Sequence, residues 1–243
     1  MYRYQQVLAV IHRPGIILQK MGPRALIHHL GRIIQHAGNR LAGYKGLSGI
    51  WIDVGAHLGE KTFHFALENP KLMVYAFEPN IEVALKRMGL LPNFVVIPMA
   101  VSEQDGCVDF YVNTYDQCSS ILPIDPNVAR NWIENTDLAV QNRICVPTIR
   151  LDTFLDLLKI PKIDYLKIDA QGADFSVIKS AGQRLQDIQK ITFEVQTTNI
   201  PLYIGASRKD ETVTYLEKSG FTFLNRETVT KDKEEDLTFI RVN

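Results

Sequence analysis

Cysteine is scarce in this sequence, and long apolar runs are missing from it. The three cysteines, Cys107, Cys118 and Cys145, are an odd number and form no C-x-x-C pair. This pattern disfavours a zinc site and predicts reduced thiols in a cytoplasmic protein. No run of residues reaches the roughly 18 apolar positions that a membrane-spanning helix needs. A secretory signal is not expected either, because no apolar segment is followed by a small-residue cleavage site.

Acidic residues are missing from the first 52 positions, where seven basic residues occur. These are Arg3, Arg13, Lys20, Arg24, Arg32, Arg40 and Lys45. The whole chain has 27 basic and 27 acidic residues, so the part from Asp53 onward is acidic by seven charges. The sequence therefore predicts a basic appendage, residues 1–48, on an acidic body.

The appendage is expected to be helical, because apolar residues recur at helical spacing from Leu26 to Ile34. Two interpretations are open. Its basic face is solvated or packs on the acidic body, or it docks on an anionic surface such as phospholipid headgroups, a lipid-linked glycan or a nucleic acid. The second interpretation places a cytoplasmic protein peripherally at a membrane. The apolar face also raises the hypothesis of a homodimer built through these helices.

Strand and helix patterns alternate from residue 49 to the end, which predicts one α/β domain over 49–243 with a mainly parallel sheet. Strands are expected at 50–54, 72–77, 94–98, 107–112, 145–149, 163–169 and 191–195, and helices at 61–68, 81–88, 153–158, 173–180 and 209–218. Asp152 is expected to cap the helix at 153–158. Residues 221–224 and 237–242 predict a terminal antiparallel hairpin. The polar, turn-rich stretch 113–143 is interpreted as an insertion that serves as a lid or binds substrate.

A glycine-containing turn follows the first strand and indicates a nucleoside cofactor. The strand ends with Asp53, and the turn contains Gly55 and Gly59 before a helix begins, so free backbone N–H groups face a ligand. Glu78 closes the second strand, where a carboxylate is placed to accept hydrogen bonds from two ribose hydroxyls. His57 stands where the dinucleotide fingerprint G-x-G-x-x-G has its second glycine, so that fingerprint is not met.

Five sequence blocks in this order resemble the FkbM-type methyltransferases, a branch of the class I S-adenosylmethionine-dependent enzymes. The blocks are Asp53-Val-Gly-Ala-His-Leu-Gly59, Phe77-Glu-Pro79, Ala100-Val-Ser-Glu-Gln-Asp-Gly106, Val146-Pro-Thr-Ile-Arg-Leu-Asp152 and Ile163-Asp-Tyr-Leu-Lys-Ile-Asp-Ala-Gln-Gly172. The resemblance implies a Rossmann-like three-layer sandwich with a C-terminal antiparallel hairpin. It also implies S-adenosylmethionine as cofactor and methyl transfer to a hydroxyl of a glycan, glycolipid or secondary metabolite.

The resemblance also implies a set of cofactor-binding residues. The loop 55–59 would run beneath the methionine and ribose parts, with Asp53 supporting it, Glu78 on the ribose hydroxyls, and Ala100 and Val101 along the adenine. The predicted set is Asp53, Val54, Gly55, Ala56, His57, Gly59, Thr62, Phe77, Glu78, Pro79, Ala100, Val101 and Asp169. For Glu78 the alternative is an acidic helix cap ahead of Pro79.

Two carboxylates are candidates for the chemistry. Asp169 and Glu194 end neighbouring predicted strands, so they should lie together at the carboxyl edge of the sheet. A hydroxyl is a poor nucleophile, so a carboxylate base, or a divalent metal held by paired carboxylates, would help to remove its proton. The structural alternatives are that Asp169 caps the following helix and that Glu194 pairs with Lys167.

Gln171 departs from the family, which usually has Asp-x-Glu-Gly where this chain has Asp169-Ala-Gln171-Gly172. The missing acid disfavours a metal, so no metal ligands are assigned. Gln171 can still orient a hydroxyl by hydrogen bonding. The predicted catalytic residues are therefore Asp169, Glu194 and Gln171. Asp174 either replaces the missing acid or is an ordinary acid in the first turn of a helix.

Other residues support weaker hypotheses. Ser119, Ser120 and Gln196 are the candidate substrate contacts, and a turn role is the alternative for the serines. His57 is either a base or a polar residue that fills space in its loop. The aromatic residues of the insertion stack on a sugar or form a local core; they are Tyr111, Tyr115 and Trp132.

Two other functions compete with O-methylation of a small molecule or glycan. The first is methylation of a nucleic acid or protein, docked by the basic arm. Nucleic acid is disfavoured, because no Asn/Asp-Pro-Pro-Tyr/Phe motif follows the strand that ends at Asp169 and the body is not basic. The second rival is a non-catalytic module that only binds S-adenosylmethionine, for which the Gln171 departure is the argument.

Overall fold

The computed structural model of the protein describes residues 46–130, 132, 136 and 138–242. The predicted basic appendage, residues 1–48, lies outside the described residues except for its last three positions. The hypotheses of an anionic docking surface and of a homodimer through its helices concern that segment, and both stay predictions.

A seven-stranded sheet forms the centre of the domain, in the order β3-β2-β1-β7-β8-β10-β9. Its strands are β1 (Gly49–Val54), β2 (Leu72–Phe77), β3 (Phe94–Ile97), β7 (Tyr165–Ile168), β8 (Lys190–Gln196), β9 (Phe221–Thr230) and β10 (Glu234–Arg241). The first five of these pair in parallel, whereas β10 runs antiparallel to both β8 and β9. This is the class I methyltransferase topology, so the predicted fold and the terminal hairpin are confirmed.

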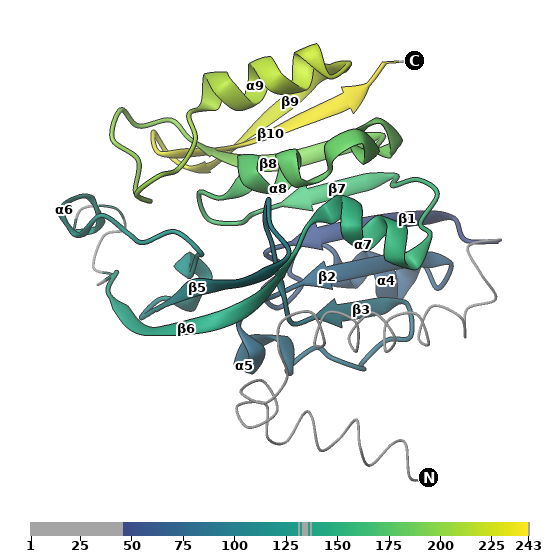
Figure 1. The fold of residues 1–243 in the computed structure, drawn as a ribbon, viewed down its shortest axis with the longest axis horizontal. Coiled ribbons are helices and arrows are strands. Elements are labelled where there is room, and N and C mark those ends of the chain that lie inside the picture. Colours follow the sequence, from purple (N-terminus) through teal and green to yellow (C-terminus); the bar gives the residue numbers. More distant parts are fainter. Residues whose placement is uncertain (1–45, 131, 133–135, 137, 243) are drawn as a thin grey trace, which may run out of the picture.

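Helices cover both faces of the sheet. They are α4 (Phe63–Glu68), α5 (Ile81–Ala84), α7 (Leu151–Leu158), α8 (Asp174–Ser180) and α9 (Lys209–Lys218). Figure 1 shows α7 and α8 in front of the sheet and α4 behind it. The alternation of β2 explains this arrangement: Met73, Tyr75 and Phe77 pack into the core with α7, while the residues between them pack with α4 on the other side.

The structure confirms one helix prediction and corrects two others. The helix α9 has the predicted bounds, 209–218. Gly220, with a φ of 85°, follows its end as predicted. The helix α5 ends four residues before the predicted Met88, and the chain continues in turns to Gly89. Asp152 is not a helix cap as predicted: α7 begins at Leu151 after the cap residue Arg150, so Asp152 lies in the first turn, where it accepts hydrogen bonds from the Arg150 guanidinium.

A smaller sheet projects from the main one, in the order β4-β6-β5. It consists of β4 (Ala100–Val101), β5 (Gly106–Asn113) and β6 (Val140–Ile149). Since β6 already begins at Val140, the predicted insertion 113–143 overlaps the first residues of this strand. Between the strands lie the 3₁₀ helix η1 (Asp116–Cys118) and the short helix α6 (Pro126–Ala129). A second 3₁₀ helix, η2 (Gly182–Asp187), follows α8 and was not predicted.

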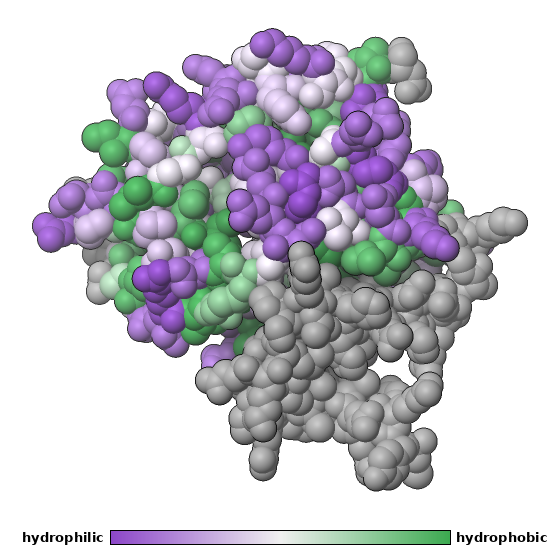
Figure 2. All heavy atoms as spheres, in the orientation of Figure 1, coloured by the Kyte–Doolittle hydropathy of each residue, from purple (hydrophilic) through white to green (hydrophobic). Residues whose placement is uncertain are grey.

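The insertion has its own small hydrophobic core, here called the satellite core. It contains Cys118, Ile124, Ala129, Trp132, Leu138, Leu202 and Tyr203. The last two residues come from the segment after β8, so this core joins the insertion to the main sheet. Figure 2 shows apolar residues at the surface on the side where Figure 1 places β5, β6 and the segment after β8. Ile200 and Ile204 of that segment are exposed.

The prediction of reduced thiols is wrong for two of the three cysteines. A disulfide joins Cys107 on β5 to Cys145 on β6, while Cys118 is a buried free thiol. Cys107 lies opposite Pro147 and Cys145 opposite Asp109, so the two cysteines are diagonal neighbours on one face of the small sheet. This pairing depends on the β5–β6 register, which the cysteine spacing does not reveal. In the part of the chain that the structure describes, none of the helices has the length and apolar character to span a membrane.

Phe154 tests how much the main core depends on α7. Its buried ring makes edge contacts with Tyr75 and Phe77, at centroid distances of 5.3 and 4.9 Å. We expect Phe154→Ala to lower the free energy of unfolding by about 3–5 kcal/mol, because it leaves a cavity. Leu157→Ala on the same helix is the matched control: this side chain is 43% exposed, so the change should be within about 0.5 kcal/mol. Urea unfolding measures both, and equal losses would contradict the prediction.

Candidate active site

A cavity of about 360 Å³ opens at the carboxyl ends of the parallel strands. In Figure 1 the arrows of β2, β3 and β7 end on the side where β5 and β6 lie, whereas β10 points the other way. The parallel strands therefore deliver the loops that follow them to one edge of the sheet. The cavity lies between this edge and the insertion.

The glycine turn after β1 is built for close approach. Gly55 has a φ of 70°, and a Cβ there would lie 1.8 Å from the carbonyl oxygen of Asp169. Only glycine fits this position, since any side chain would push the end of β7 away. Gly59, with a φ of 71°, meets the ring of Phe94 instead. The first glycine thus shapes the floor of the cavity, and the second packs the turn onto β3.

A buried ion cluster lies behind the turn. The Nζ atom of Lys167 is 3.2 Å from Asp53 Oδ1 and 3.5 Å from Asp169 Oδ2, and it donates to the carbonyl of Gly55 at 3.2 Å. Thr62 donates its hydroxyl to the second oxygen of Asp53. Burial alone would lower the pKa of Lys167, but the two carboxylates raise it, so the lysine stays charged. Lys167 therefore pairs with the two aspartates. The structural alternative, in which Lys167 pairs with Glu194, is wrong.

Glu78 is fixed by two backbone N–H groups. His57 N donates to Oε2 at 2.9 Å and Asn80 N donates to Oε1 at 2.7 Å. Burial raises the pKa of Glu78 to about 7 despite these hydrogen bonds, which lower it. The helix-cap alternative for Glu78 is wrong, because Asn80 caps α5 through its side chain. The carboxylate instead lines the cavity beside the glycine turn.

His57 connects the glycine turn to the insertion. Its Nδ1 lies 2.6 Å from Glu60 Oε1 and its Nε2 lies 3.3 Å from Asp116 Oδ2 in η1. Burial lowers the pKa of His57, but hydrogen bonds and charge from both carboxylates outweigh burial and raise it. The ring therefore lies at the cavity wall between two acids, a geometry that serves to join two segments of chain.

Asp169 and Glu194 share one hydrogen-bond donor. Gln171 Nε2 donates to Asp169 Oδ1 at 2.6 Å and to Glu194 Oε2 at 3.3 Å. Burial raises the pKa of Glu194 well above its usual range, and the charges of Asp169 and Glu234 add to this. The helix-cap alternative for Asp169 is wrong, since the residue before the first turn of α8 is Ala173. The predicted catalytic side chains are therefore brought together at the cavity.

Asp174 lies beneath this group. Its Oδ1 accepts a hydrogen bond from Ala170 N at 3.3 Å, and the side chain is buried in the first turn of α8. Burial, followed by the charge of Asp169, raises the pKa of Asp174 to about 7. Asp174 does not line the cavity, so its geometry favours the helix-acid alternative.

The insertion and the terminal hairpin close the other side of the cavity. Ser119 and Ser120 line it, but their hydroxyls bind the backbone: Asn113 N donates to Ser119 Oγ at 3.0 Å, and Ser120 Oγ donates to Gln171 O at 2.8 Å. Tyr115 and Trp132 also line it. Trp132 belongs to the satellite core as well, which agrees with the local-core alternative, and stacking on a sugar stays a prediction.

Four predicted residues do not line the cavity. Asp53 and Thr62 lie in the buried ion cluster, and Gly59 packs on Phe94. Gln196 accepts a hydrogen bond from Leu202 N through Oε1 at 2.8 Å and so holds the segment after β8. The other predicted cofactor residues line the cavity: Val54, Gly55, Ala56, His57, Phe77, Glu78, Pro79, Ala100, Val101 and Asp169.

Several residues of the cavity were missed by sequence reasoning. Met99 and Phe110 extend the apolar wall beside Ala100 and Val101, and Glu234 at the start of β10 adds a third carboxylate beside Glu194. Burial raises the pKa of Glu234, against hydrogen bonds from Thr230 and Trp132 that lower it. Glu234 reaches the site through the pairing of β10 with β8, for which the sequence carries no local signal. Among the described residues, no cluster of three or more His, Cys, Asp or Glu side chains could hold a metal ion; metal independence stays a prediction.

Comparison with known proteins assigns the chain to a family. The methyltransferase FkbM domain matches residues 53–223, which is more than half of the chain. The protein belongs to the FkbM methyltransferase family. The resemblance to the FkbM-type methyltransferases is thereby confirmed.

The individual proteins to which this chain is similar share little sequence identity with it. The 2-O-methyltransferase NoeI of Sinorhizobium fredii is 25% identical over 140 residues, which cover 55% of this chain and 58% of NoeI. The magnesium protoporphyrin IX methyltransferase of Synechocystis with bound S-adenosylmethionine has a TM-score of 0.44 at 9% identity, over 89% of this chain and 81% of that one. TrmK of M. capricolum has a TM-score of 0.41 at 13% identity, over 82% and 65%.

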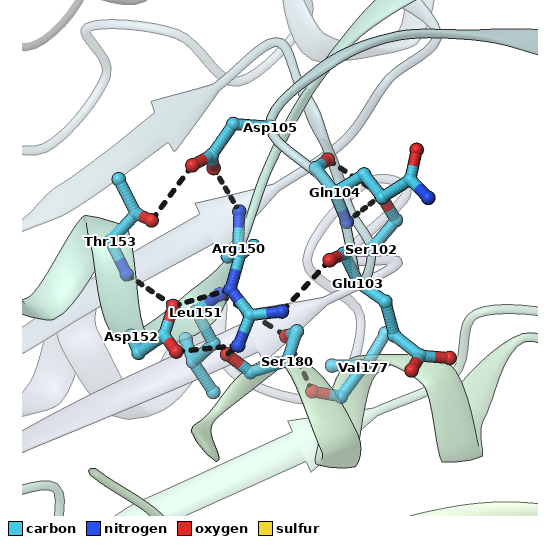
Figure 3. A network of polar contacts seen from close by, with 10 residues as sticks. All are labelled: Ser102, Glu103, Gln104, Asp105, Arg150, Leu151, Asp152, Thr153, Val177 and Ser180. Atoms are coloured by element: carbon cyan, nitrogen blue, oxygen red, sulfur yellow. Dashed lines mark hydrogen bonds and ion pairs between the residues drawn. The ribbon is translucent and has the colours of Figure 1, made fainter. Parts of the chain in front are cut away.

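Two blocks of the FkbM resemblance, 100–106 and 146–152, build a structural network (Figure 3). The guanidinium of Arg150 donates to Asp152 at 2.9 and 2.5 Å, to Glu103 O at 2.8 Å and to Ser180 O at 3.3 Å. Asp105 accepts from Arg150 N and from the Thr153 hydroxyl. The turn that follows Ala100 and Val101 is thereby tied to α7 and α8.

Arg150→Ala should lower the free energy of unfolding of this FkbM methyltransferase by about 2 kcal/mol, because charged hydrogen bonds to two elements are lost. Arg150→Lys should recover less than half of the loss, since an ammonium cannot make the paired bonds of a guanidinium. Chemical unfolding measures both variants. Arg143→Ala is the control: its partner Asp109 and the guanidinium are exposed, so no measurable change is expected. A fully stable Arg150→Ala protein would contradict the structural role.

Proposed function

We propose that this enzyme transfers the methyl group to a hydroxyl oxygen of a glycan, glycolipid or other polyhydroxylated small molecule. The observation that carries the proposal is the arrangement of Asp169, Gln171 and Glu194, in which two carboxylates share one amide donor at a cavity next to the glycine turn. The relative NoeI is named a 2-O-methyltransferase, which supports oxygen as the accepting atom.

The cavity residues suit S-adenosylmethionine. We propose that Glu78 takes the ribose hydroxyls, because its oxygens are already fixed by two backbone N–H groups and keep further lone pairs for a ligand. An apolar slot for the adenine would be formed by Ala100 and Val101 together with Met99 and Phe110. The turn Gly55–His57 would lie beneath the methionine part, and the ion pair of Asp53 with Lys167 would support this turn.

The chemistry that the protein must add is alignment and proton removal. When bound, the cofactor supplies a methyl group on a positively charged sulfur. The bond from sulfur to the methyl carbon breaks as the new C–O bond forms, and the sulfur becomes a neutral thioether. We propose that Glu194 takes the hydroxyl proton, because its raised pKa makes the ionised carboxylate a stronger base than an ordinary glutamate. Asp169 would hold the same hydroxyl in line as a hydrogen-bond acceptor.

The charge of the cavity supports a neutral or cationic acceptor. Its lining includes six carboxylates, Glu60, Glu78, Asp116, Asp169, Glu194 and Glu234, but two lysines, Lys61 and Lys167. A phosphate beside the reacting hydroxyl would be repelled, which argues against a nucleic acid. The acceptor side instead offers hydrogen-bond acceptors and the rings of Tyr115 and Trp132, which suit a sugar.

Cofactor binding should depend on pH through Glu78. Its pKa in the free protein is about 7, and ribose hydroxyls would favour the ionised form. Because binding then lowers the pKa, affinity should be lost as the pH falls through 7 and should rise about tenfold from pH 6 to pH 8. Isothermal titration with S-adenosylhomocysteine measures this. Glu78→Gln should bind more weakly and lose the slope; an unchanged slope would remove Glu78 from the ribose site.

Methyl transfer is tested with S-adenosylmethionine carrying a labelled methyl group and a panel of free oligosaccharides and glycolipids. Glu194→Gln should lower kcat at least about 100-fold, as expected for loss of a general base. In the wild type, kcat should rise with pH as Glu194 ionises through its raised pKa. Exposed Glu68→Gln on α4 is the control. Tight cofactor binding without turnover on any hydroxylated acceptor would favour the non-catalytic module instead.

A further inference from the structure

The amide of Gln171 has a defined direction. Its nitrogen faces Asp169 and Glu194, while its oxygen accepts a hydrogen bond from the Tyr203 hydroxyl at 2.6 Å. The two ends of an amide have nearly the same shape, so their hydrogen-bond partners decide which end points where. A tyrosine hydroxyl that donates on one side leaves the N–H groups for the carboxylates on the other.

Tyr203 is held firmly in place. It is fully buried in the satellite core, and its hydroxyl also lies 3.1 Å from the carbonyl oxygen of Cys118. A Cβ at Gly172 would lie 2.8–2.9 Å from atoms of the Tyr203 side chain, so glycine is needed for the ring to pack here. Burial raises the pKa of Tyr203 well above its usual range, which keeps the hydroxyl a donor.

The backbone of Gln171 is also constrained. Its φ of 51° is in the left-handed region, which non-glycine residues seldom adopt. The hydroxyl of Ser120 donates to its carbonyl at 2.8 Å and so helps to hold this conformation. Ser120 of the insertion therefore contacts the backbone of Gln171, and Tyr203 of the satellite core contacts its side chain.

The carboxylates need this donor because they repel each other. The ammonium of Lys167 offsets the negative charge of Asp169, but the ion pairs of Lys167 do not include Glu194. The two N–H bonds of the Gln171 amide offer one donor to each carboxylate. If the amide were reversed, its oxygen would face both, and repulsion would replace two hydrogen bonds.

We propose that Tyr203 is a positioning residue for methyl transfer: its hydroxyl sets the direction of the Gln171 amide, which then holds Asp169 and Glu194 together at the acceptor hydroxyl. This inference rests on the proposed function for its catalytic consequence, but not for the hydrogen-bond chain itself. It also connects the packing of the insertion to the two carboxylates, because Tyr203 belongs to the satellite core.

The test measures the pKa of Glu194 in the complex with S-adenosylhomocysteine. Glutamate labelled with ¹³C at the side-chain carboxyl group is followed by NMR across a pH titration, and the signal that disappears in Glu194→Gln is assigned to Glu194. Tyr203→Phe keeps the ring and removes the hydroxyl. It should raise the pKa of Glu194, because the N–H that stabilises the ionised form is no longer directed at it. Affinity for S-adenosylhomocysteine should stay within twofold. With an active acceptor, kcat should fall about tenfold and KM for the cofactor should not change.

A double-mutant cycle separates positioning from packing. Gln171→Ala should raise the pKa of Glu194 as well, and adding Tyr203→Phe to it should change nothing further. Tyr215→Phe, which removes the hydroxyl of a ring that packs on Phe175 of α8, is the matched control and should leave the titration unchanged. An unshifted Glu194 in Tyr203→Phe, or fully additive effects, would overturn the proposal.

Two further results are decisive. If Tyr203→Phe does not fold, 3-fluorotyrosine at position 203 keeps the ring and the hydroxyl and changes only the strength of the donor; the Glu194 titration must then move for the proposal to stand. If the titration behaves as expected but the wild type methylates no hydroxylated acceptor, the positioning chain holds and the proposed O-methylation fails. The two inferences are thereby tested separately.

Discussion

The buried ammonium of Lys167 is the interaction on which the edge of the sheet depends. It lies between carboxylates from two neighbouring strands, Asp53 of β1 and Asp169 at the end of β7, and it also binds the carbonyl of Gly55. A buried pair of this kind is costly to break, because removing one partner leaves an uncompensated charge. Lys167 therefore holds the glycine turn against the end of β7. The approach is so close that a Cβ on Gly55 would collide with the carbonyl oxygen of Asp169. The glycine turn and the end of β7 therefore form one structural unit.

Local signals in the sequence were enough for the frame of this unit. Apolar runs closed by Asp53 and Glu78 predict strand ends, and the glycines between them predict a turn, because these effects act over a few residues. Glu234 and Tyr203 could not be found in this way. The first enters through the pairing of β10 with β8, and the second through the satellite core. The disulfide was missed for the same reason, since only the β5–β6 register brings Cys107 to Cys145.

The departure at Gln171 has a clear physical meaning in the structure. A glutamate at this position would place a third carboxylate beside Asp169 and Glu194, a group that would require a cation or extra protons. The amide instead donates to both acids at 2.6 and 3.3 Å. The change therefore replaces a charge by a hydrogen-bond donor, and it does not by itself argue for loss of activity. What it demands is a partner that fixes the direction of the amide, and the Tyr203 hydroxyl provides that contact.

The insertion is consequently more than a cover over the cavity. Its 3₁₀ helix contacts the glycine turn through Asp116 and His57, and its core contains the tyrosine that meets Gln171. The insertion thus contacts the cavity wall at two places, at the glycine turn through Asp116 and at Gln171 through Ser120. In the proposed positioning chain, a change in the packing of the satellite core is expected to alter the geometry of Asp169 and Glu194, because Tyr203 contacts Gln171 and Gln171 contacts both acids. Under the proposed function, acceptor binding beside the insertion and proton removal by Glu194 would then be coupled through this chain of contacts.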